Sequence, residues 1–199
     1  MFTCRSVVLL LLLSVTFAVA QEKGAAGIDP MAGTGAIKGN VYTNTYFGFT
    51  FPVPSNWRVL LGPDSIAAQG GCGKTQCRVL ALQADKGIGR VTIDVHPISA
   101  GGSAQALLTK AAEGEQAMGF QAAGAVQEPT SAGLKFYRQD LTTDGGSGGQ
   151  ILETLMAAQA KGDAVIITIL TDSHDTLNQL ASGVQSAGVA DAKAGKVPK

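Results

Sequence analysis

A run of aromatic side chains constrains the fold of this chain more than any other feature of its sequence. Five of the eleven aromatic residues lie in the twelve positions from Tyr46 to Trp57. From Phe47 to Val53 every second residue is apolar, which is typical of a half-buried strand. Two prolines then hold the chain extended and end the strand, since proline has no N–H group to donate. The hydrophobic core is therefore expected to start here.

The first twenty residues have the pattern of a cleavable export signal. Arg5 precedes an apolar run from Val7 to Ala20, and the small residues Ala18-Val19-Ala20 stand before Gln21. This run is too short for a membrane-spanning helix, which needs roughly twenty apolar residues. Residues 1–20 are predicted to be a signal peptide. The mature protein is expected to be exported to the periplasm or the extracellular space, with no stable transmembrane segment.

Charge and composition narrow the function classes. The chain has fifteen basic and fifteen acidic groups, and loss of Arg5 with the signal would leave fourteen and fifteen. Such a balance gives no basic surface for a nucleic acid, so binding to nucleic acid is not expected. Residues 41–189 suit a single domain. The leader 21–40 and the tail 190–199 contain few large apolar residues and are expected to be flexible.

Two cysteines, Cys72 and Cys77, follow the predicted cleavage site. Disulfides persist outside the cytoplasm, so we expect these cysteines to be bonded to each other. Redox-active pairs have the C-x-x-C spacing, whereas four residues separate this pair, which favours a structural bridge. Strand-like residues follow Cys77, and the bridge is expected to lie at the tip of a hairpin.

Alternating and helical patterns predict a mixture of strands and helices. Residues 90–95 have one apolar and one polar face, as in an antiparallel sheet. Residues 151–160 fit both a helix and a strand, and the turn-like sequence after them favours the strand of a hairpin. Helices are predicted from Ser103 to Gly119 and from Asp172 onward, because Ser103 suits an N-cap and acidic residues suit a first turn. Further strands are predicted at 78–82, 124–127, 134–142 and 164–170.

One short motif suggests catalysis. Gly145-Gly146-Ser147-Gly148-Gly149 matches the G-x-S-x-G pattern of a hydrolase nucleophile elbow, and Asp163 and His174 follow in the chain order of such enzymes. The chain contains 26 glycines, however, and an elbow requires a parallel sheet. A glycine-rich hairpin loop explains the same residues and is preferred, so a small serine hydrolase using Ser147 is kept as an alternative only.

Other motifs point to no cofactor or metal. Gly70 to Thr75 is similar to the end of a phosphate-binding loop, but Ala68 stands where the first glycine is needed. His96 and His174 are expected at the surface, because a metal site needs several converging ligands. Neither a catalytic residue nor a bound cofactor is predicted.

The aromatic rings allow a second alternative. Phe49, Phe51 and Trp57 can pack in the core or line a pocket for an apolar small ligand. Core packing is the more common use of such rings. A carrier of an apolar ligand is therefore kept as the other alternative function.

The whole pattern resembles the PsbP-like superfamily. The residues that carry the resemblance are Tyr46, Gly48, Phe49, Phe51, Pro54 and Trp57, followed by the strand 165–171 and a helix from Asp172 to Gly188. The resemblance covers most of residues 41–189. It implies an α+β fold, with an antiparallel β-sheet and helices packed on both faces. It also implies a non-enzymatic accessory domain that binds an unknown protein or a small ligand, and it assigns no functional residue.

Overall fold

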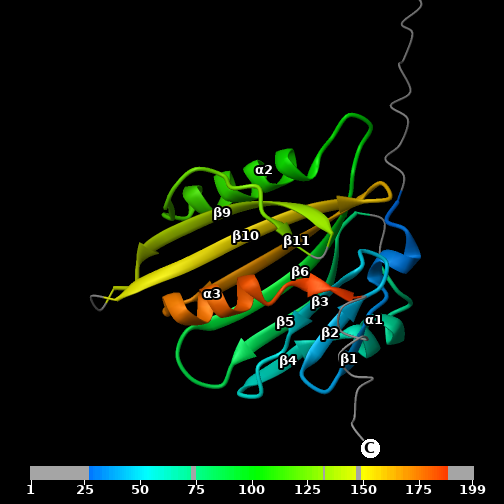
Figure 1. Ribbon diagram of the computed structural model, residues 1–199, viewed down its shortest axis with the longest axis horizontal. Helices are drawn as coiled ribbons and strands as arrows, with labels where there is room; N and C mark the ends of the chain where they lie inside the picture. The colour runs from blue at the N-terminus through cyan, green and yellow to red at the C-terminus, as the bar shows by residue number, and fades with distance from the viewer. Residues whose placement is uncertain (1–26, 73–74, 132, 147–148, 188–199) are drawn as a thin grey trace, which may run out of the picture.

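The chain folds as an α+β protein in which two antiparallel sheets pack together and helices cover the larger one (Figure 1). The computed structural model describes residues 27–72, 75–131, 133–146 and 149–187. The small sheet has the order β1 (Ala36–Lys38), β2 (Val41–Asn44), β3 (Phe49–Pro52) and β12 (Gln185–Ser186). The large sheet has the order β4 (Trp57–Leu61), β5 (Cys77–Ala84), β6 (Gly89–Pro97), β11 (Asp163–Thr171), β10 (Gln150–Ala160), β9 (Leu134–Asp144) and β7 (Gln121–Ala122), and β8 (Thr130–Ser131) pairs with β9.

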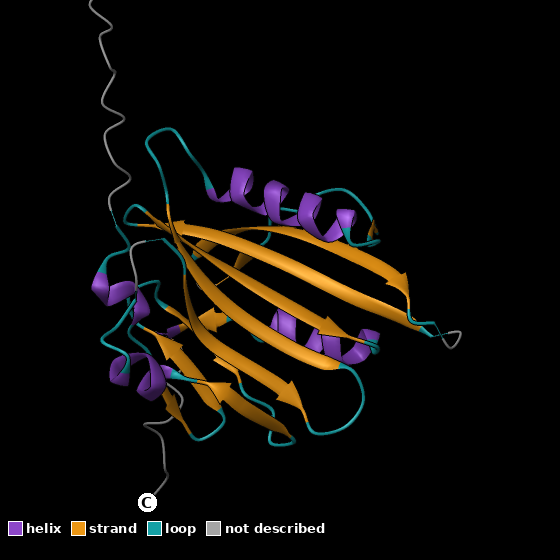
Figure 2. Ribbon diagram, turned by 180° about the vertical axis from the view of Figure 1, so that it is seen from behind, coloured by secondary structure: helices purple, strands orange, loops and turns teal. Residues whose placement is uncertain are grey.

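Helices pack on both faces of the large sheet, as the fold prediction requires (Figure 2). One face packs against the small sheet and α3 (His174–Ser182), and the main core lies between them. The opposite face carries α2 (Ala104–Ala117), which packs mainly on β9 and β10. This second, smaller core includes Leu108 of α2 and Leu155 of β10. Because α2 lies over only part of the sheet, it leaves much of β5 and β6 uncovered on that face.

The alternation of side chains along β6 separates the two faces. Val91, Ile93 and Val95 are fully buried in the main core. Successive side chains of a strand point to opposite faces, so the even-numbered residues from Arg90 to His96 point to the α2 side. The predicted division of residues 90–95 into an apolar and a polar face in an antiparallel sheet is confirmed. The polar face is not the solvent-exposed one expected, however, because Thr92 and Asp94 are each 6% exposed.

Both predicted helices form. Ser103 caps the first as expected, whereas the last is capped by the Ser173 hydroxyl and not by the acidic side chains expected to do so. The Ser103 hydroxyl accepts a hydrogen bond from Ala106 N over 3.1 Å, and the Ser173 hydroxyl accepts one from Thr176 N over 3.3 Å. The prediction that the last helix continues to Gly188 is wrong, because α3 ends at Ser182. A Cβ atom at Gly183 would collide with Pro52, and the chain then pairs with β3 as β12.

Two strand predictions have different outcomes. The choice of a strand for residues 151–160 is confirmed, because β10 pairs with β9 on one side and β11 on the other. The strand expected at 124–127 is wrong. Gly124 has a φ of 146°, a conformation that favours glycine, and only Gln127 of that segment makes a β-bridge, to Arg138.

The N-terminal segment differs from the flexible leader expected at 21–40. From residue 27 onward it is ordered, with a short 3-10 helix η1 (Pro30–Gly33) followed by β1, which pairs with β2. Ile28 and Ala32 are buried in the main core. Sequence composition missed this because few side chains are involved and backbone pairing supplies the rest. The predicted signal 1–20, residues 21–26 and the predicted tail 190–199 lie outside the described residues.

A short helix, α1 (Pro63–Ala68), links β4 to the segment before β5 and begins with a proline at its first turn, where the missing N–H group has no effect. Within the part of the chain that the structure describes, no helix is long and apolar enough to span a membrane.

Candidate functional site

A groove of about 390 Å³ lies where the C-terminal half of α2 meets the uncovered part of the large sheet. Its floor comes from β5, β6, β10 and β11, and α2 forms one wall. The lining residues are Gln76, Arg78, Arg90, Thr92, Asp94, His96, Ala111, Glu115, Met118, Glu153, Ile166, Thr168 and Leu170. The volume falls in the range of small-molecule sites.

The sheet register places opposite charges along one row of the groove. Arg90 of β6 stands opposite Leu170 of β11, and Leu170 stands opposite Glu153 of β10. All three side chains point to the α2 side, because residues opposite one another in antiparallel strands share a face. The row therefore has a guanidinium at one end and a carboxyl at the other, with an apolar side chain between them.

Glu153 is the most unusual residue of this groove. The residue is 2% exposed, and its Oε2 atom has no hydrogen-bond partner among the described residues. Burial and, to a smaller extent, the nearby Glu115 carboxylate together raise the pKa of Glu153 to about 8. Burial also raises the pKa of Glu115. A buried polar atom without a partner costs about 1–3 kcal/mol, so this arrangement is unfavourable unless something else bonds to it.

A rigid ion pair lies beside the row. Arg78 donates two hydrogen bonds to Asp94, from Nε to Oδ1 over 3.0 Å and from Nη2 to Oδ2 over 3.1 Å. The Asp94 side chain is 8% exposed. Burial lowers the pKa of the neighbouring His96 below 6.5, although Asp94 raises it to a smaller extent. His96 is therefore neutral at neutral pH.

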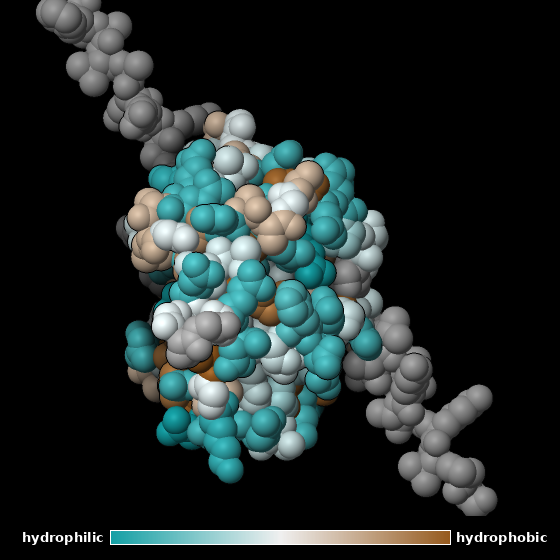
Figure 3. Space-filling view, turned by 90° about the vertical axis from the view of Figure 1, so that its left-hand side faces the viewer, coloured by the Kyte–Doolittle hydropathy of each residue, from teal (hydrophilic) through white to brown (hydrophobic). Residues whose placement is uncertain are grey.

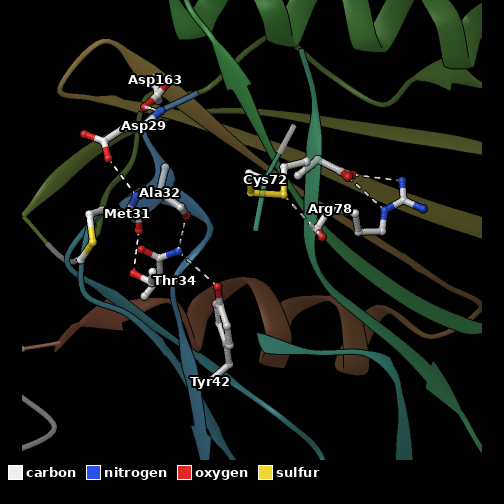
Figure 4. Close-up of a disulfide and its surroundings, with 11 residues drawn as sticks. Asp29, Met31, Ala32, Thr34, Tyr42, Cys72, Arg78 and Asp163 are labelled. Atoms are coloured by element: carbon white, nitrogen blue, oxygen red, sulfur yellow. Dashed lines mark hydrogen bonds and ion pairs between the residues drawn. A yellow bond between two sulfur atoms is a disulfide. The ribbon is translucent and has the colours of Figure 1, made fainter. Parts of the chain in front are cut away.

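The predicted disulfide between Cys72 and Cys77 is confirmed (Figure 4). Its expected position at a hairpin tip is wrong. Cys72 follows α1, and Cys77 is the first residue of β5, so the bridge fastens the connection from α1 to the start of that strand. Cys72 also lies against Gly33, where a Cβ atom would collide with its sulfur. The bridge thus fixes the strand end that carries Arg78. Lys74, in the segment that was rejected as a phosphate-binding loop, lies outside the described residues.

The residues of the hydrolase alternative do not come together. Asp163 begins β11 and is 3% exposed, whereas His174 is exposed and follows the other end of the same strand. A nine-residue strand is roughly 25 Å long, so Asp163 and His174 do not make the contact that the hydrolase alternative requires. Ser147 lies outside the described residues. Its neighbours form the connection of the β9–β10 hairpin, as the preferred interpretation predicted.

The two histidines are also far from a shared site, since His96 ends β6 and His174 begins α3. Among residues that the structure describes, no three His, Cys, Asp or Glu side chains converge as metal ligands.

The aromatic residues proposed to line an apolar pocket lie mostly in the core. Phe49 and Phe51 are fully buried, and Phe49 packs against Tyr42 and Phe47 at ring distances of 6.2 and 6.4 Å. Trp57 is half-buried and packs against the same core. The groove on the α2 side is lined by other residues. Figure 3 shows a largely hydrophilic surface on which hydrophobic side chains occur in small groups.

Sequence reasoning missed Glu153 and the arginines as site residues. One signal was present, because Glu153 is an acidic residue inside an otherwise apolar strand. Such a residue is rarely buried without a partner.

Comparison with known proteins shows similarity in structure only. No protein-family model matches the sequence, and no curated protein matches it. Among solved structures, the cyanobacterial PsbP (CyanoP) from Synechocystis sp. PCC 6803 matches at 13% identity and a TM-score of 0.48, covering 73% of this chain and 91% of the other. A PsbP protein, from the superfamily that the sequence resembles, is thus among the solved structures that this chain is similar to in fold.

Two further solved structures match over similar lengths. The Saccharomyces cerevisiae Ran-binding protein Mog1p matches at 8% identity and a TM-score of 0.41, covering 73% of this chain and 83% of the other. LpqN of Mycobacterium tuberculosis, described as involved in cell envelope biogenesis, matches at 14% identity and a TM-score of 0.35, covering 68% and 76%. These likenesses concern the fold alone.

Proposed function

We propose that the protein is an exported, non-catalytic binding domain and that the groove between α2 and β6 is its ligand site. The buried carboxyl of Glu153 carries this proposal. Its Oε2 atom lacks a partner among the described residues, and a ligand that donates a hydrogen bond would satisfy it. Export is supported by the predicted signal and by the Cys72–Cys77 disulfide, since disulfides persist mainly outside the cytoplasm.

The lining of the groove indicates a small polar ligand. Six of its lining residues carry ionisable acidic or basic groups, namely Arg78, Arg90, Asp94, His96, Glu115 and Glu153. This composition favours a ligand with polar or charged groups over the apolar ligand considered from the sequence. The Arg78–Asp94 pair gives the groove a fixed polar wall on which such a ligand can be oriented.

The positions of Asp163 and His174 favour a binding function over serine hydrolysis. The Asp163 and His174 side chains lie at opposite ends of β11, and Asp163 already accepts hydrogen bonds from Tyr46 and from Asp29 N. A base that must activate a serine needs direct hydrogen-bond contact with its orienting carboxylate. His174 has no such contact with Asp163.

NMR titration of the mature protein tests the proposed site. Small amines, amides, guanidines and carboxylates are added to isotope-labelled protein, and amide shifts are followed. We expect the shifts to cluster on β6, β10 and the end of α2, and Glu153→Leu to remove them. Glu113→Gln is the matched control, because Glu113 is an exposed glutamate on α2 outside the groove lining. Shifts confined to other surfaces, or none at all, would refute the site.

A further inference from the structure

We infer that the groove is specific for a dipolar ligand, whose ammonium group binds at Glu153 and Glu115 and whose carboxylate binds at Arg90. This inference rests on the proposed function, because it names the ligand class of the same groove. It is argued from the distance between Arg90 and Glu153, which stand at either side of Leu170 in one row. It also uses the lack of an ion pair at Arg90 and of a hydrogen-bond partner at Glu153 Oε2 among the described residues.

Arg90 differs from the other arginines of the described residues in its lack of an ion pair there. Arg58 contacts Asp85 at 3.1 Å, Arg78 contacts Asp94 at 3.0 Å, and Arg138 contacts Asp140 at 2.8 Å. Arg90 makes no ion pair within the described residues, although it lines the groove. Its guanidinium is therefore available to a carboxylate, which it can bind with two parallel hydrogen bonds.

The other end of the row, at Glu153 and Glu115, favours a positively charged group of the ligand. Glu153 is 2% exposed and faces Glu115 of α2. A buried carboxyl group with a second, half-buried carboxyl group beside it favours a cation between them, because a nearby positive charge stabilises the ionised form of both. The other groups of the groove do not supply that cation, since Arg78 is held by Asp94 and His96 is neutral at neutral pH.

Arg90 and Glu153 do not neutralise each other. Their strands are separated by β11, so their backbones lie roughly 10 Å apart. Leu170 occupies the position between them, and Thr168 lies on the same face one pair further along β11. A ligand with a short apolar segment between its two charges would cover Leu170 and reach both ends.

Ligands with two charges of the same sign fit the groove less well. A diamine would place a positive charge beside Arg90, and a dicarboxylate would place a negative charge beside Glu153 and Glu115. Like charges at these separations repel. The complementary ligand therefore has one charge of each sign, as in ω-amino acids or in the side chain and terminus of a short peptide.

Isothermal titration calorimetry with matched probes tests the inference. The probes are 6-aminohexanoate, 1,6-diaminohexane and hexanedioate, which share one chain length and differ only in their end groups, and 4-aminobutanoate varies the length. We expect the wild-type protein to bind 6-aminohexanoate at least tenfold more tightly than the diamine or the diacid. Arg90→Gln should abolish the preference over the diamine, and Glu153→Gln should weaken both the binding of 6-aminohexanoate and its preference over the diacid, which Glu115 still repels.

Two controls keep the result interpretable. Arg58→Gln removes an arginine outside the groove lining and should leave all affinities unchanged. Thermal unfolding of each variant shows that it is folded. Equal affinities, a preference of the wild-type protein for the diamine or the diacid, or no binding of any probe would overturn the dipolar inference. The NMR titration judges the groove separately, because shifts there with other compounds would leave the proposed site standing.

Discussion

The Tyr46 hydroxyl donates a hydrogen bond to Asp163 Oδ2 over 2.9 Å and so joins the β2–β3 turn to the start of β11. Asp29 N donates to the same carboxylate oxygen over 3.3 Å, and Lys161 Nζ lies 4.6 Å from the centre of the Tyr46 ring. Burial raises the pKa of Tyr46 above its usual value, and the Asp163 carboxylate raises it further. Asp163, which the hydrolase alternative grouped with Ser147 and His174, therefore has a structural role.

Tyr46→Phe should destabilise the protein by about 1–3 kcal/mol, because it leaves a buried carboxylate with one hydrogen-bond donor fewer. Urea unfolding measures the change. Tyr137→Phe is the matched control, since the Tyr137 ring is only half-buried and lies under Lys135, and this variant should cost less. Equal losses for the two variants would contradict the structural role of the Tyr46–Asp163 bond.

Stability should fall as the pH rises from about 5 to 8. The pKa of Glu153 is about 8 in the folded protein and 4.5 in its unperturbed state, so the folded state holds this proton more tightly than the unfolded state. The stabilising contribution is complete below the unfolded pKa and is lost as the pH rises through the folded pKa. The loss is at most about 1.4 kcal/mol per pH unit over this interval.

Urea unfolding of the wild-type protein and of Glu153→Gln at pH 5, 6, 7 and 8 measures this dependence. Glutamine cannot ionise, so the stability of the variant should change less across the series. Glu115 on α2, the charged group that acts on Glu153, remains in both proteins, and Arg90 stays at the far end of the row. Parallel profiles for the two proteins would show that Glu153 titrates as an ordinary surface glutamate.

Replacing both cysteines of the bridge should destabilise the protein by about 2 kcal/mol, as the chain-entropy model gives for so short a loop. The variant Cys72→Ser/Cys77→Ser tests this in thermal unfolding, with reduced wild-type protein as a second measurement. Because the bridge fixes the strand end next to Arg78, the variant should also bind groove ligands more weakly. An unchanged unfolding temperature together with unchanged affinity would refute both effects.

Phe49→Ala should cost about 3–5 kcal/mol, because it opens a cavity in the main core. Phe49 is fully buried and contacts two other rings. If the groove is the ligand site, ligand affinity of the folded variant should stay the same. A change in affinity without a change in stability would contradict the core role of Phe49 and support the aromatic residues as the binding surface.

The sequence predicted the elements whose pattern is local. The alternation in β6 and the N-cap at Ser103 each depend on neighbouring residues, and both are present in the structure. The end of α3 depends on a distant contact, that of Gly183 with Pro52, and was predicted wrongly. The burial of Glu153 also depends on tertiary structure, because it requires α2 to cross over β10. Alternation showed the polar face of β6 but not which residues on other strands complete a groove with it.

Groove residues and core residues alternate along β6. Arg90, Thr92 and Asp94 line the groove, and Val91, Ile93 and Val95 lie between and after them in the core. Replacing an even-numbered residue can alter recognition while the core stays intact. Deleting or inserting a single residue would exchange the two sets, because every later side chain would move to the opposite face. If the groove is the ligand site, its preference can therefore diverge through point substitutions in β6, whereas a change in strand length would move core side chains out of the core.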